Sequence, residues 1–132
     1  MKIIILLTMI FCHIVDDFYL QGVLAKMKQK SWWEQNAPDP LYRNDYKIAL
    51  IEHAFSWTFM MMLPLIVWMI WKDQIEIIPY CYLFGANLII HAFVDNRKAN
   101  MLDCSLMLDQ GFHVAQIVAT WLIMIGFFMK NI

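Results

Sequence analysis

Long apolar runs alternate with short polar segments along this chain. A helix needs roughly 20 apolar residues to cross the hydrocarbon core of a bilayer, and four of the runs approach or exceed that length. They predict helices over residues 2–21, 47–71, 77–95 and 102–129, with a polar loop over residues 22–46. The pattern therefore predicts an all-α fold, an integral membrane four-helix bundle that forms a single transmembrane domain over residues 1–132.

Glycine and proline agree with these limits. Gly22 follows the first run, a position typical of helix ends. Pro79 falls in the first turn of the third helix, where its missing N–H costs little. Pro64 lies inside the second run and predicts a kink, which membrane helices tolerate. The first run begins as a signal peptide does, but no A-x-A-like cleavage site follows it, so we expect an uncleaved first helix.

The composition narrows the class of protein. Hydrophobic residues make up 61% of the 132 positions and charged residues 16%, whereas a soluble domain carries about 25% charged residues. A chain this short cannot bury four such runs in a water-soluble core, so the bilayer is the expected solvent. The net charge of -1 leaves no basic surplus for nucleic acid. The three cysteines have no CxxC spacing and predict no disulfide framework.

Lysine and arginine are divided unevenly between the two sides of the expected bundle. Seven of the ten lie in or beside the first and third connections: Lys26, Lys28, Lys30, Arg43, Lys47, Arg97 and Lys98. Cytoplasmic loops of membrane proteins carry such an excess. We therefore expect loops 22–46 and 96–101 in the cytoplasm and both termini outside.

The histidines fall one per predicted helix, all toward the same side of the expected bundle: His13, His53, His91 and His113. Three of them have an aspartate at a spacing of four, in the pairs His13/Asp17, His91/Asp95 and Asp109/His113. Residues four apart share a helix face, and a polar face in lipid must turn to the bundle interior. The sequence therefore predicts a polar His/Asp pocket near the cytoplasmic side. Three further acids lie off these faces or in a turn and are expected to be solvated: Asp16, Glu52 and Asp103.

Such a pocket favours a bound cation. An ionised carboxylate near mid-bilayer costs about 2.5–3.5 kcal/mol, and several together repel one another. Imidazole with carboxylate is a normal ligand set for zinc, iron or manganese. The predicted ligands of one or two divalent ions, zinc being the first choice, are His13, Asp17, His91, Asp95, Asp109 and His113. A hydrogen-bonded structural network and a path for protons or an ion stay open as alternatives.

The same residues resemble the motifs of a bacterial and phage membrane family catalogued as Domain of Unknown Function 3307. The matching pieces, in chain order, are His13-x-x-x-Asp17-Phe18-x-Leu20-Gln21, His53, Asn87-x-x-x-His91-x-x-x-Asp95-x-x-Lys98 and Asp109-Gln110-x-x-His113. The resemblance covers nearly the whole chain and implies a bacterial or prophage source. Analogy with similar His/Asp membrane proteins implies a metal-dependent hydrolase.

These expectations combine into one functional hypothesis. A metal-dependent hydrolase would act on a lipid-linked or amphipathic phosphoester at the cytoplasmic leaflet of the bacterial inner membrane. Its predicted partners are the bilayer and the lipid-like substrate, without nucleic acid, and the sequence leaves its oligomeric state open. The expected catalytic residues are His53, Asp17 and Asp109; Gln21, Asn87 and Gln110 would orient the ligands, and Lys98 and Arg97 would bind phosphate. The alternatives are a small ion or proton transporter, and a non-catalytic phage protein such as a lysis or exclusion factor.

Overall fold

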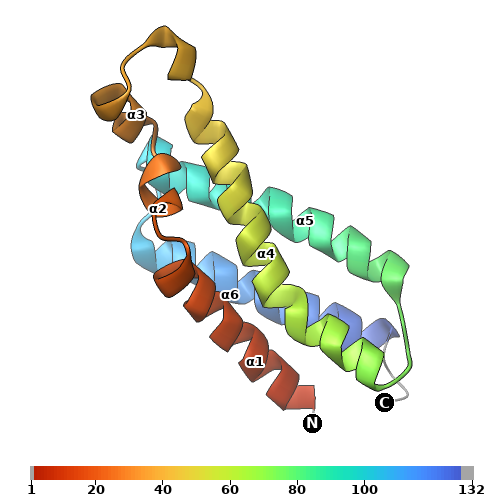
Figure 1. Cartoon of the computed structure of the whole chain (residues 1–132). Coiled ribbons are helices and arrows are strands. Elements are labelled where there is room, and N and C mark those ends of the chain that lie inside the picture. Colours follow the sequence, from red (N-terminus) through yellow and green to blue (C-terminus); the bar gives the residue numbers. More distant parts are fainter. Residues whose placement is uncertain (1, 129–132) are drawn as a thin grey trace.

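The computed structural model describes residues 2–128, and all regular structure within that range is helical. Four long helices dominate it (Figure 1): α1 (Lys2–Val15), α4 (Asp45–Trp71), α5 (Ile77–Asn96) and α6 (Leu106–Ile123). Together with the helical turns that adjoin them, all four are long and apolar enough to cross a membrane. The all-α prediction and the four membrane-capable helices are confirmed.

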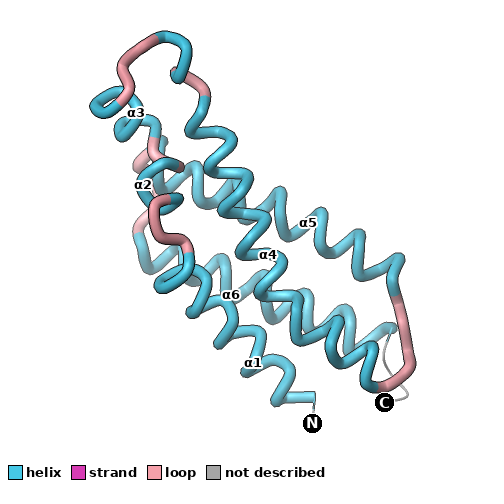
Figure 2. The backbone as a smooth tube through the Cα atoms, in the orientation of Figure 1, coloured by secondary structure: helices cyan, strands magenta, loops and turns pink. Residues whose placement is uncertain are grey.

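The long helices form a closed ring. Helix α1 packs against α4 and α6, and α5 packs against the same two helices from the opposite side. The chain runs up and down between neighbours, so α1 begins and α6 ends at one end of the bundle (Figure 2). This arrangement brings the second half of α1, the first half of α4, the second half of α5 and the first half of α6 to the opposite end.

Local residues set the end of the first predicted helix and the start of the fourth. Helix α1 continues as one wide π-helical turn, Asp16–Leu20, and ends before Gly22, whose φ of +49° favours glycine. The predicted start of the fourth helix at residue 102 is wrong. Leu102 has a φ of +59°, and Ser105 caps α6 by accepting a hydrogen bond from the Leu108 amide at 3.3 Å. Residues 1 and 129–132, included in the predicted domain, lie outside the described residues.

The predicted polar loop contains short helices. They are α2 (Leu24–Met27), α3 (Lys30–Asn36) and a 3₁₀ turn, Pro40–Tyr42. Helix α5 continues as a π-helical turn, Arg97–Met101. Asn100 in this turn forms hydrogen bonds to the polar segment 22–46. Its side-chain amide donates to the Lys28 carbonyl at 3.1 Å, and its oxygen accepts from the Lys30 amide at 2.7 Å. The segment is therefore fixed to the end of α5.

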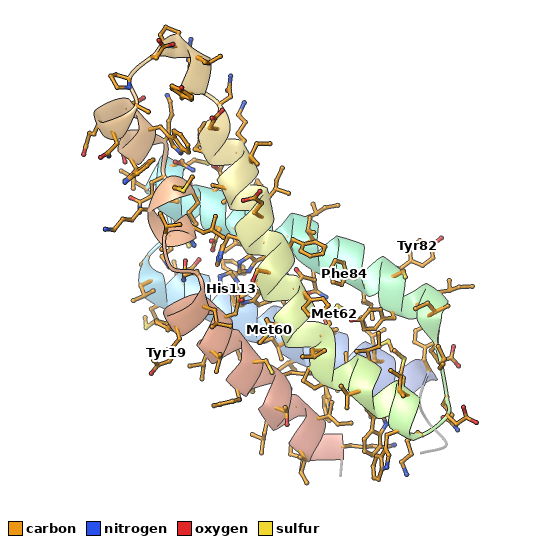
Figure 3. The ribbon with its side chains drawn as sticks, viewed as in Figure 1. Tyr19, Met60, Met62, Tyr82, Phe84 and His113 are labelled. Atoms are coloured by element: carbon orange, nitrogen blue, oxygen red, sulfur yellow. The ribbon has the colours of Figure 1, made fainter. Side chains whose placement is uncertain are left out.

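Polar and apolar side chains are distributed opposite to those of a water-soluble bundle. Large apolar side chains such as Phe11, Phe93 and Ile89 are exposed, while four histidines and four aspartates are buried. Figure 3 shows His113 inside the bundle and Tyr19 and Tyr82 projecting outward. The interior also contains a purely apolar part built largely from Met9, Met61, Leu65, Met69, Ile117 and Met124. An exposed apolar surface of this extent is typical of helices that face lipid.

Candidate metal centre

The four histidines meet in the interior of the bundle, and each is at most 2% exposed. The ring centroids of His91 and His113 are 4.2 Å apart, and those of His53 and His91 are 5.1 Å apart. His13 lies 5.7 Å from His113. The structure thus brings together, from four helices, the four rings that the sequence placed at one side.

One group that could hold a metal ion consists of His53, His91 and Asp95. The two Nε2 atoms lie 3.2 Å apart. Asp95 Oδ2 lies 3.0 Å from Nε2 of His53, and Oδ1 lies 3.9 Å from Nε2 of His91. Ligand atoms about 2.0–2.1 Å from a tetrahedral zinc are about 3.3 Å from one another. The two Nε2 atoms, with the Asp95 oxygens at 3.0 Å and 3.9 Å from them, therefore approach the spacing that such an ion requires.

A second group consists of Asp17, Asp109 and His113. Nε2 of His113 lies 3.3 Å from Asp109 Oδ1 and also 3.3 Å from Asp95 Oδ1. Asp95 therefore lies between the two groups: Oδ2 approaches His53 of the first group, and Oδ1 approaches both His91 of the first group and His113 of the second. Both His113 Nε2 and Asp109 Oδ1 are buried without a hydrogen-bond partner among the described residues. Their spacing and unfilled bonding capacity fit a shared cation.

His13, predicted as a metal ligand, lies outside both metal-capable groups. Trp57 Nε1 donates to His13 Nδ1 at 2.7 Å, so the ring proton of neutral His13 is on Nε2. That nitrogen lies 3.1 Å from Gln110 Oε1, and Gln110 Nε2 donates to Asp17 Oδ2 at 2.7 Å. Both ring nitrogens of His13 are engaged, and His13 belongs to neither metal-capable group. The hydrogen bonds of Trp57, His13 and Gln110 thus lead to Asp17, while His53 belongs to one of the groups that could hold a metal ion.

The three residues predicted to orient the ligands, Gln21, Asn87 and Gln110, lie in two different parts of the interior. Gln21 donates to Asp17, with its Nε2 3.2 Å from Oδ1. Asn87 lies deeper, where it donates to Thr120 Oγ1 at 2.8 Å and accepts from Gln116 Nε2 at 3.2 Å. Gln21 and Gln110 thus contact a candidate ligand, whereas Asn87 belongs to a separate amide and hydroxyl layer.

Two lysines reach the carboxylates of the cluster. Lys28 Nζ lies 2.5 Å from Asp95 Oδ2, and Lys98 Nζ lies 2.5 Å from Asp109 Oδ2. Both lysines line a cavity of about 400 Å³ that also reaches Asp17 and Asp95. Arg97, predicted to bind phosphate, instead forms an exposed two-pronged pair with Asp103. Its guanidinium holds the pKa of the Asp103 carboxyl below its usual range.

Sequence reasoning missed three residues of this centre. Asp16 is fully buried and accepts from Ser56 Oγ at 2.7 Å, so the expectation of a solvated Asp16 is wrong. The π-helical turn that begins at Asp16 widens the helix and lets adjacent acids both face inward. Glu52 and Asp103 are exposed, as expected. Trp57 stacks on His91 with centroids 4.1 Å apart, and Lys28 directly follows the last residue of α2; neither has a sequence signal beyond residue type.

Comparison with known proteins gives no match to a family model, to a curated protein or to a solved structure. The site's geometry is therefore the basis for any functional inference.

Proposed function

We propose that this chain is a multi-pass protein of the bacterial inner membrane that holds one or two divalent cations in its His/Asp cluster. It uses them to hydrolyse a lipid-linked or amphipathic phosphoester at the cytoplasmic leaflet. The observation that carries the proposal is the 3.2 Å approach of Nε2 of His53 and Nε2 of His91 beside Asp95. Zinc is the first choice because two imidazoles and a carboxylate leave one position of a tetrahedral ion open, as in catalytic sites. Iron and manganese accept the same ligand types.

The charge of the cluster supports a bound cation. Four buried carboxylates, those of Asp16, Asp17, Asp95 and Asp109, face the two ammonium groups of Lys28 and Lys98. With neutral imidazoles, the form in which histidine binds metals, the cluster carries two uncompensated negative charges. Isolated charges in a low-dielectric interior are expensive, so one divalent ion would restore neutrality.

The roles of the acids follow from their partners. A bound metal lowers the pKa of a coordinated water and supplies hydroxide near neutral pH. When the group of His53, His91 and Asp95 holds the ion, His53 is a ligand, and the general-base role passes to Asp17, with Asp109 beside it. Asp17 accepts hydrogen bonds from Gln21 and Gln110, which fix the direction of its oxygens. A base held by two amides is suited to removing a proton at one position.

The cavity offers a route for an amphipathic substrate. Lys28, Lys98 and Asp17 give it a polar wall, and Phe18 and Leu106 give it an apolar one. It lies at the end of the bundle that carries α2 and α3, where the excess of lysine and arginine indicates the cytoplasm. A head group would meet charged residues there while its tail stays in lipid.

The polar part of the interior does not continue through the whole bundle, and this favours hydrolysis over transport. Beyond the layer of Asn87, Gln116 and Thr120, the described interior is lined mainly by methionine, leucine and isoleucine, together with Trp68 and Tyr80, and it contains no buried carboxylate or imidazole among the described residues. A path for protons or ions needs polar groups toward both faces of the membrane. A pocket closed at one end is suited to binding and chemistry.

The test is the metal content of the full chain, purified in detergent and measured by mass spectrometry. One or two zinc, iron or manganese ions per chain are expected, and a His53→Ala, His91→Ala double variant should lose the ion of its group. Thr120→Val, which changes a buried polar group outside both ligand groups, is the matched control and should keep its metal. Metal-loaded protein should then release product from phospholipid or lipid-pyrophosphate substrates. Native protein without metal, even after incubation with divalent ions, would refute the proposal.

A further inference from the structure

The two lysines of the cavity hold the same carboxylates that the metal would use. Lys28 Nζ lies 2.5 Å from Asp95 Oδ2, and that oxygen lies 3.0 Å from Nε2 of His53. Lys98 Nζ lies 2.5 Å from Asp109 Oδ2, while Oδ1 of Asp109 faces His113. Each ammonium group thus shares a carboxylate with one of the two metal-capable groups.

An ammonium group and a divalent cation compete for such a carboxylate. Both are positive, and at a separation of a few ångströms in a protein interior they repel by several kT. A cation bound by His53, His91 and Asp95 therefore weakens the attraction that holds Lys28, and one bound by Asp17, Asp109 and His113 weakens that of Lys98. The Lys28 amide donates to the Leu24 carbonyl, and Asn100 holds the Lys28 carbonyl and the Lys30 amide, so the main chain is fixed and the side chain alone is free to turn.

The cavity is where a released ammonium group would go. Lys28 and Lys98 both line it, and its volume of about 400 Å³ exceeds that of a phosphate group. The remaining wall includes Phe18, Leu102 and Leu106, which suit an apolar substituent. Lysine binds phosphate as a mobile point charge. Two such charges converging on one cavity are matched to a tetrahedral anion.

We propose that metal binding converts Lys28 and Lys98 from partners of Asp95 and Asp109 into a binding site for the phosphate group of the substrate. The metal then binds first and the phosphate second. The inference rests on the metal site of the proposed function and adds the anion-binding residues and the order of binding. The charges agree with it: two divalent ions change the cluster from two negative charges to two positive ones, which a phosphate dianion neutralises.

The first measurement is binding of radiolabelled inorganic phosphate to the full chain in an uncharged maltoside detergent, by equilibrium dialysis with and without zinc. Phosphate should bind at least tenfold more tightly to zinc-loaded protein. A Lys28→Met, Lys98→Met double variant should lose that gain but keep its zinc. Lys26→Met, exposed on the same short helix, and Arg97→Gln, beside Lys98 but paired with Asp103, are matched controls and should behave as the native chain.

The second measurement is zinc affinity by competition with a chelator. Because the ammonium group competes with the metal, Lys28→Met should bind zinc more tightly, by about tenfold, whereas Lys28→Arg should not. Variants that elute as the native chain does in size-exclusion chromatography are compared, and Lys98→Met provides an independent second case. Unchanged or weaker zinc affinity in both methionine variants would overturn the competition.

The two proposals fail in different ways. Zinc that binds while phosphate affinity is the same with and without it, or survives in the double lysine variant, overturns the inference and leaves the metal site intact. Absence of zinc binding refutes the proposed function itself. Displacement of phosphate by short-chain phosphatidic acid would support a lipid head group as the source. Retention of phosphate against that lipid would support a free phosphate compound, still bound by the two lysines.

Discussion

The Nε2 atoms of His53 and His91 face each other at 3.2 Å in the interior of the bundle. If the two neutral rings share one hydrogen bond, one donates through Nε2 and the other must carry its proton on Nδ1. Both Nδ1 atoms are buried without a partner among the described residues. The second ring would then bury an unsatisfied N–H, at a cost of about 1–3 kcal/mol. A cation between the two Nε2 atoms would replace that shared hydrogen bond and give both facing lone pairs a partner, and both rings would then carry their protons on the unpartnered Nδ1 atoms.

His91 and His13 should differ in their effect on metal binding. His91→Ala removes a ligand atom and should abolish binding of one ion. His13→Ala removes only a group that orients Asp17 through Gln110, so it should weaken affinity by about 10–100-fold and leave the stoichiometry unchanged at saturating zinc. Zinc titration of both variants in detergent distinguishes them. Equal loss of an ion in the two variants would make His13 a ligand.

Trp57→Phe should expose the role of the Trp57–His13 hydrogen bond. Phenylalanine preserves a ring near His91 but removes the donor to His13 Nδ1. The expected loss of stability is about 1 kcal/mol, the net value of one such bond. Nitrogen NMR of the His13 ring should show mixed tautomers in the variant and proton occupancy of Nε2 alone in the native chain. A single tautomer in both proteins would contradict this assignment.

The main features of the fold could be predicted because they depend on local pattern. Apolar run length fixes the four helices, and Gly22 marks where the first helical segment ends. The start of α6 could not be predicted from the apolar pattern, since Leu102 and Cys104 extend it on the N-terminal side of Leu106. Only the left-handed backbone of Leu102 and the cap by Ser105 show that it begins at Leu106.

The candidate site was predictable as a set of residue types but not as a set of contacts. A spacing of four brings each Asp onto the face of its His, and three such pairs lie in the cluster. Which histidine accepts the hydrogen bond from Trp57 depends on the order of helices around the bundle, which the sequence does not specify. For that reason the sequence predicts His13 as a ligand and gives no indication that Lys28 reaches the cluster. Asp16 was misjudged because a regular helix separates adjacent residues by about 100°, whereas the structure has a wider turn there.

Asn87 should matter for stability and not for metal. Its side chain joins Thr120 and Gln116 across α5 and α6, a layer distinct from both ligand groups. Asn87→Leu removes these bonds and should lower the free energy of unfolding by about 0.6–1.7 kcal/mol, the range for hydrogen bonds between membrane helices. Thermal unfolding in detergent measures the loss, and zinc content should equal that of the native chain. A variant that unfolds normally but loses its metal would place Asn87 among the orienting residues after all.

The Arg97–Asp103 pair should respond to pH independently of the buried cluster. Arg97 Nη2 lies 2.8 Å from Asp103 Oδ2, and this partner holds the pKa of Asp103 below its usual range. A lowered pKa in the folded state means that the pair adds stability above the ordinary pKa of aspartate and loses it as pH falls through the lowered value. Arg97→Gln should therefore raise the pKa of Asp103 toward the ordinary value near 3.9. Carbon NMR of the Asp103 carboxyl during an acid titration measures the shift.

Because both side chains are more than 40% exposed, the change in stability should be small and should diminish further in high salt. A pKa that does not move would mean that the pair is not formed in solution, and Arg97 would again be free to serve as an anion ligand beside Lys98.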